Sequence, residues 1–139
     1  MSLSAIPSAL RKQIFTRDAA RCRYCGLLQI GQAAVFHINH ILPRSAGGLT
    51  IADNLVLQCP SCSLHKSNKT TALDPETRLW AALFHPLEQN WNQHFSLDEH
   101  GAVRGLTPAG RATSVALHMN DPLPLIARAL QLRLGLISP

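Results

Sequence analysis

The four cysteines of the chain form two pairs of the same spacing, Cys22-x-x-Cys25 and Cys59-x-x-Cys62. Two intervening residues allow both sulfurs of a pair to reach one tetrahedral ion, and two such pairs complete a closed set of ligands. In a reducing compartment, cysteine pairs of this kind hold metal far more often than they form disulfides. The spacing predicts a structural Zn²⁺ site; buried free thiols or a redox pair are the alternatives.

Between the two pairs lies the segment Phe36–Pro43, which contains His37, Asn39 and His40. An imidazole titrates near neutral pH and can accept a proton from water. In a regular strand, alternation would place His37 and Asn39 on one face and His40 on the other. The segment therefore contains candidates for acid–base chemistry, although a histidine here could also be a structural part of the core.

Positive charge accompanies these residues. Residues 1–70 contain eight basic and two acidic residues, a net charge of +6, whereas residues 71–139 contain five basic and six acidic residues, a net charge of −1. A basic half indicates a polyanionic partner such as nucleic acid, and a solvated basic surface is the alternative.

Hydrophobic spacing and turn residues predict an α+β protein of about one domain. We expect a metal-bearing region at 1–70 and a C-terminal extension at 71–139, packed together as one compact unit. The last predicted helix carries an apolar stripe that we expect to be core: Leu125, Ile126, Ala129, Leu130 and Leu134. The predicted elements are helices at 7–18, 60–68, 108–119 and 124–134, strands at 33–38 and 55–58, a loop at 45–54, and a hairpin turning at Gly101.

No run of residues approaches the ~18 apolar positions that a membrane-spanning helix requires. The first residues also lack a basic region followed by an apolar one, so we do not expect a secretory signal. We therefore expect a cytoplasmic protein with no membrane partner, either a monomer or a weak dimer.

The order of motifs resembles that of the HNH endonucleases. The resemblance spans about residues 10–70 and rests on five motifs: His40-Ile-Leu-Pro43, Gly47-Gly48, Asn54-Leu55, the two cysteine pairs and Lys66. It implies a ββα-metal core of the His-Me finger type, held by a zinc ion on the four cysteines. The C-terminal hairpin and helices predicted from the sequence pattern would extend this core. It also implies metal-dependent hydrolysis of DNA, with double-stranded DNA as the expected substrate and Mg²⁺ or Mn²⁺ as the cation. By family position, His40 is the general base and Asn54 orients it or its loop.

Two positions depart from the family pattern. Asn39 stands where Asp, Glu or His is usual, and Ser63 stands where His or Asn is usual. Both are weaker ligands for a catalytic cation. His37 shares a strand face with Asn39 and could compensate, whereas His65 lies about 200° around its helix from Ser63.

Three hypotheses of function follow from these motifs. The first is a metal-dependent endonuclease, the second a catalytically weakened or inactive zinc module that binds nucleic acid, and the third a zinc-stabilised protein-interaction domain. The basic half counts against the third hypothesis. The residues expected to contact phosphates are Arg23, Arg44, Lys66 and Lys69.

Overall fold

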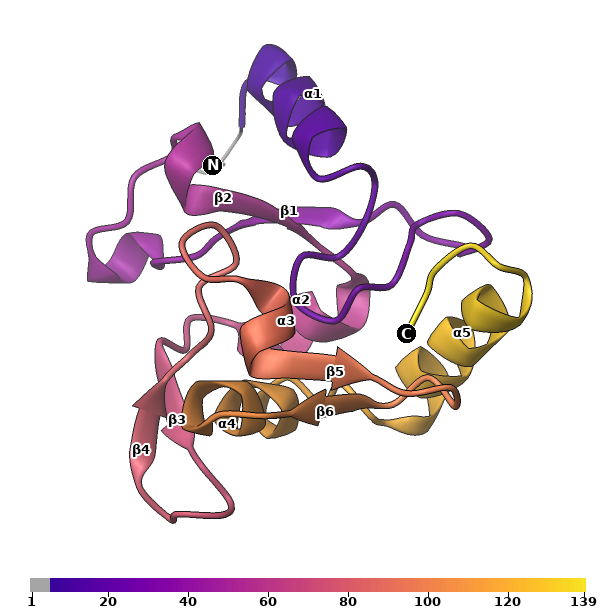
Figure 1. The fold of residues 1–139 in the computed structure, drawn as a ribbon. Coiled ribbons are helices and arrows are strands. Elements are labelled where there is room, and N and C mark those ends of the chain that lie inside the picture. Colours follow the sequence, from indigo (N-terminus) through magenta and orange to yellow (C-terminus); the bar gives the residue numbers. More distant parts are fainter. Residues whose placement is uncertain (1–5) are drawn as a thin grey trace.

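The computed structural model describes residues 6–139, in which short helices alternate with three two-stranded sheets (Figure 1). The prediction of an α+β protein is confirmed. In chain order the helices and strands are α1 (Ser8–Arg17), β1 (His37–His40), β2 (Leu55–Gln58), α2 (Pro60–Lys66), β3 (Thr71–Leu73), β4 (Trp80–Ala82), α3 (Trp91–His94), β5 (Phe95–Leu97), β6 (Val103–Gly105), α4 (Pro108–Ala116) and α5 (Pro122–Arg133).

Strands β1 and β2 form an antiparallel pair, and α2 follows β2 after a single residue (Figure 1). His37 lies opposite Gln58, and His40 lies opposite Leu55. Helix α2 begins at Pro60 because the Cys59 side chain caps it by accepting a hydrogen bond from the Cys62 amide. This ββα arrangement is the one that the motif order predicts.

The predicted strand at 33–38 is wrong in its bounds, since β1 runs from His37 to His40. His37 pairs with Gln58, the last residue of the four-residue strand β2. The residues before His37 therefore have no strand residues opposite them with which to pair. Upstream of β1, the Phe36 amide donates instead to Oε1 of Gln29 at 2.8 Å. The predicted loop at 45–54 also contains short 3₁₀ helices at Arg44–Ala46 and Ala52–Asn54.

Asp18 joins α1 to the strands. Its buried carboxylate accepts from the Leu57 amide at 2.9 Å and pairs with Arg17 at 2.8 Å and Arg23 at 2.9 Å. Ile14 is fully buried on the same helix. One hydrophobic core runs from α1 through β2 to the C-terminal hairpin, and it includes Phe95.

The C-terminal residues form two hairpins, β3–β4 and β5–β6, that pack with α4. The predicted hairpin turn at Gly101 is confirmed, and its φ of 89° is one that glycine adopts readily. The predicted cap of α4 is also confirmed, because the Thr107 hydroxyl accepts from the Gly110 amide. Helix α4 ends at Ala116, earlier than expected.

The apolar stripe expected to be core on the last helix is not buried as predicted. Ile126, Leu130 and Leu134 are 51%, 56% and 74% exposed, whereas Arg128 and Gln131 are buried. The polar side chains turn inward because they have backbone partners there: Arg128 donates to the carbonyls of Gly101 and Met119, and Gln131 bonds to both backbone groups of Leu28. No helix in residues 6–139 combines the length and apolar character that crossing a bilayer requires.

Candidate functional site

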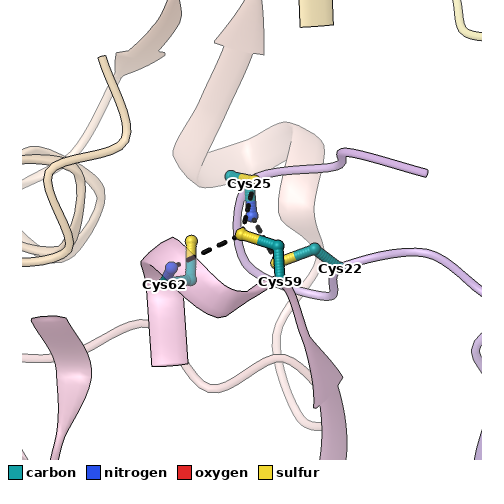
Figure 2. Close-up of side chains that lie close together, drawn as sticks. All are labelled: Cys22, Cys25, Cys59 and Cys62. Carbon is teal, nitrogen blue, oxygen red and sulfur yellow. Dashed lines mark hydrogen bonds between the residues drawn. The ribbon is translucent and has the colours of Figure 1, made fainter. Parts of the chain in front are cut away.

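The four cysteines converge in the fold. Cys22 and Cys25 come from the loop after α1, Cys59 from the end of β2 and Cys62 from α2, and their sulfurs point toward one another (Figure 2). All four are buried and their Sγ atoms lie within 4.8 Å of one another. Four sulfurs bound to one tetrahedral zinc at about 2.3 Å would stand about 3.8 Å apart. The Sγ atoms of Cys25 and Cys59 are 3.8 Å apart, so the cluster could hold a zinc ion.

Backbone hydrogen bonds and a glycine turn hold the cysteine side chains in place. Backbone amides donate to two of them, from Cys25 to Cys22 and from Cys62 to Cys59. Gly26 turns the chain after the first pair with a φ of 84°. Hydrogen bonds from the other thiols, that of Cys22 first, lower the pKa of Cys25, whereas hydrogen bonding to Cys22 and burial raise the pKa of Cys59.

His40 is the last residue of β1, and its side chain is half-buried. Its Nε2 lies 2.8 Å from the Thr50 hydroxyl, which fixes the ring. The pKa of His40 is lowered by burial first, and then by the positive charges of Arg44 and Lys66. The imidazole is therefore neutral near pH 7, which is the form that can accept a proton.

Asn54 shapes the loop that follows His40. Its side chain accepts from the Leu42 amide at 2.8 Å and donates to the carbonyls of Leu42 at 3.0 Å and Leu49 at 2.9 Å. The loop is so tight that a Cβ on Gly48 would lie 1.8 Å from the Leu42 carbonyl oxygen. The Asn54 side chain thus holds the loop that carries Thr50.

The three predicted ligands of a catalytic cation also come together. Asn39 Nδ2 donates to Ser63 Oγ at 2.5 Å, and His37 Nδ1 lies 3.0 Å from the same hydroxyl. Nδ2 of Asn39 also donates to Oε1 of the buried Gln58 at 2.8 Å. Because Nδ2 makes both bonds, the carbonyl oxygen of Asn39 is the atom of this amide that could ligate an ion.

Two hollows meet at these residues. One, of about 320 Å³, is lined by Asn39, His40, Arg44 and Ser63 among others, and the second, of about 440 Å³, is lined by Arg11, His37, Asn39 and His40 among others. His40 and Asn39 therefore lie between two hollows, each with an arginine on its wall.

The remaining predicted phosphate-binding residues lie elsewhere. Lys66 is 2% exposed, and its ammonium donates to the carbonyls of Ile41 at 3.0 Å and His40 at 3.4 Å, beneath the site. Arg23 pairs with Asp18 and donates to the Pro86 carbonyl at 2.7 Å. Lys69 is exposed and donates to the His65 carbonyl. Of the predicted set, Arg44 is the one on the wall of the hollows.

Sequence reasoning did not single out Thr50, Gln58 or Arg11 as site residues. Gln58 could have been found once the strands were paired, since it lies directly opposite His37. Thr50 comes ten residues after His40, and only the closed loop brings the two side chains together. Arg11 lies in α1, and no motif or spacing in the sequence predicts that it would lie beside β1.

Comparison with known proteins agrees with this geometry. Residues 22–69 match the family model described as HNH endonuclease. A search of curated proteins found no match. The matched segment begins at the first cysteine of the cluster and includes β1, β2 and α2, so it covers the cysteines, His40, Asn54 and Ser63. The match at residues 22–69 therefore indicates a nuclease-type function with a nucleic acid substrate.

Proposed function

We propose that the protein is a metal-dependent endonuclease that hydrolyses phosphodiester bonds in double-stranded DNA, with His40 as the general base. The observation that carries the proposal is the position of His40, a neutral and fixed imidazole between two hollows with Arg11 and Arg44 on their walls. Arginines hold phosphate oxygens through paired donors and would seat the backbone of the substrate across these hollows.

The tautomer of His40 decides which nitrogen acts. With Nε2–H donating to the Thr50 hydroxyl at 2.8 Å, Nδ1 keeps the free lone pair. Nδ1 then takes the proton from the attacking water, while Thr50 holds the ring in place. Asn54 contributes indirectly by closing the loop that positions Thr50.

The proposed site of the catalytic Mg²⁺ or Mn²⁺ contains His37, Asn39 and Ser63. These side chains offer one nitrogen and two oxygens, all neutral. A hard cation is commonly held by only part of a protein site together with substrate phosphate and water. The uncharged set therefore fits an ion shared with the DNA backbone, which when bound would stabilise negative charge developing on the phosphate.

The cysteine cluster has a different proposed role. Four thiolates fill the coordination sphere of Zn²⁺ and leave no position for substrate, so the ion would be structural. It would join the loop after α1 to the start of α2 and thereby support both Ser63 and Lys66.

The test is cleavage of supercoiled plasmid by the full-length, zinc-loaded protein with Mg²⁺ or Mn²⁺, with and without EDTA. We expect nicked or linear DNA from the wild type and none from His40→Ala. The matched control is His100→Ala, since His100 is an exposed histidine of the C-terminal hairpin. Equal cleavage by wild type and His40→Ala would refute the role of His40, and an RNA substrate assayed in parallel would test the preference for DNA.

A second function is favoured by one observation: Asn39 stands where Asp, Glu or His is usual in the family, and Ser63 stands where His or Asn is usual. In that case the protein is a zinc-stabilised module that binds nucleic acid without cutting it. Retention of DNA with strong salt dependence, together with intact plasmid in every metal tested, is the result expected for this alternative.

A further inference from the structure

A second group of metal-ligating side chains lies outside the proposed nuclease site. His65, on the last turn of α2, meets His118 and Asp121 in the turn between α4 and α5. The two imidazoles stack with their centroids 4.0 Å apart and their planes 24° apart. One candidate ligand atom from each of the three residues lies within 4.8 Å of the other two. His65 reaches this cluster because it projects from a different face of α2 than Ser63.

His65 is already oriented as a metal ligand would be. Its Nδ1 lies 2.9 Å from the carbonyl oxygen of Ser61. A carbonyl can only accept, so Nδ1 carries the proton and Nε2 keeps its lone pair. Histidines that bind metal are commonly held in this way, with the other ring nitrogen donating to a carbonyl or a carboxylate.

His118 and Asp121 lie close to each other, and their side chains are exposed enough to move toward a bound ion. His118 Nδ1 lies 3.2 Å from Asp121 Oδ2, longer than the ~2.7–2.9 Å typical of a strong charged hydrogen bond. The side chains of His118 and Asp121 are 49% and 51% exposed. Nitrogen and oxygen ligands of one tetrahedral ion stand about 3.3 Å apart, and imidazole lone pairs lie in the plane of the ring. Binding of one ion therefore requires the exposed His118 ring to turn out of its stack on His65 while the side chains move together.

We propose that His65, His118 and Asp121 form a second metal site, which takes a divalent transition-metal ion of the Zn²⁺, Co²⁺ and Ni²⁺ class. Two imidazole nitrogens and one carboxylate oxygen suit such ions, and water completes the coordination. The site differs from the cysteine cluster in its donors and in its exposure. A bound ion joins α2, which carries Ser63 and Lys66, to the turn between α4 and α5.

The experiment uses the full-length protein with its cysteine cluster loaded with zinc, dialysed and then titrated with Co²⁺. We expect one additional Co²⁺ per chain, with the weak visible absorption of nitrogen and oxygen ligands and without the intense charge-transfer band of cobalt bound to thiolate. At a 100-fold excess over its dissociation constant, the ion should raise the melting temperature by roughly 5–10 °C.

Two variants and a control identify the site. His118→Gly removes the imidazole without strain, because His118 has a left-handed φ of 52° that glycine accepts. Asp121→Asn keeps the shape of the side chain and removes its charge. We expect both to weaken the additional Co²⁺ by roughly tenfold or more, and we expect His100→Ala to leave it unchanged. The proposal is overturned if the wild type takes up no additional Co²⁺ at millimolar concentration, if both variants bind it as the wild type does, or if its spectrum shows thiolate ligands.

Discussion

Replacing Lys66 by methionine tests the electrostatics beneath the site. The Lys66 ammonium is buried and has no carboxylate partner within residues 6–139; it donates to the carbonyls of Ile41 and His40. Burial first, and the charge of Lys69 second, lower the pKa of Lys66 from 10.5 to about 8. Lys66→Met keeps the apolar stem and removes the titration, so a comparison of the two proteins isolates this one group.

The sign of the effect follows from the two pKa values. Below about pH 8 the lysine is charged in both states, and the folded protein bears the cost of burying the charge. Between about 8 and 10.5 the folded protein releases the proton while the unfolded chain retains it, so this cost is relieved as pH rises. From about pH 7 to about pH 10, the free energy of unfolding of the wild type should gain about 2.5 kcal/mol relative to Lys66→Met.

The assay is urea denaturation of both proteins at the two pH values, with zinc held at a fixed concentration. The pH-dependent behaviour of the cysteines is common to both proteins and cancels in the difference. Lys12→Met, which removes an exposed lysine from α1, is the charge-matched control and should show no comparable change. The difference in free energy of unfolding between wild type and Lys66→Met should rise with pH. If it is constant or falls, the claim that Lys66 is buried with a lowered pKa is refuted.

Three further predictions concern the loop and the base. Gly48→Ala would place a Cβ 1.8 Å from the Leu42 carbonyl oxygen, so it should destabilise the fold by about 1–3 kcal/mol in urea and abolish plasmid cleavage. Gly47→Ala, which meets no atom within 4 Å, should cost only the strain of its φ of 91° and keep cleavage. Thr50→Val should slow single-turnover cleavage roughly 2–10-fold, while Thr50→Ser should not; equal rates would show that the hydroxyl does not hold His40. Because burial and neighbouring positive charges lower the pKa of His40, cleavage should fall only below pH 6.5 on acidification; a midpoint above that value would contradict the assignment of the base.

The parts of the molecule that follow from short-range rules were predictable. The cysteine spacing identifies four residues that do converge, because the geometry of a metal ligand pair is set within four positions of the chain. Strand alternation correctly places His37 and Asn39 on one face, where both meet Ser63. The order of these motifs also predicts the ββα arrangement and the match of residues 22–69 to the HNH endonuclease family model.

The parts that depend on distant partners were not predictable in the same way. The apolar stripe on α5 predicts a buried face. Arg128 and Gln131 occupy the buried positions instead, because they donate hydrogen bonds there to the carbonyls of Gly101 and Leu28. Hydrophobic periodicity describes only how apolar residues are distributed around the helix itself. It contains no information about polar groups on the surface against which the helix packs. Thr50 is hidden for the same reason, since the closure of its loop creates its contact with His40.

The contacts of the C-terminal residues with the cysteine loop bear on how this chain could be engineered. Gln131 bonds to the amide of Leu28 at 2.9 Å across 103 positions, and the Trp91 indole donates to the Tyr24 carbonyl at 2.7 Å across 67 positions. A graft of residues 22–69 into a host protein would transfer the thiol ligands but leave these loop groups without their partners. The segment that could be moved into another protein without losing these contacts is therefore longer than the segment matched by the family model. A fusion protein that is meant to keep this domain folded should therefore retain the chain through α5.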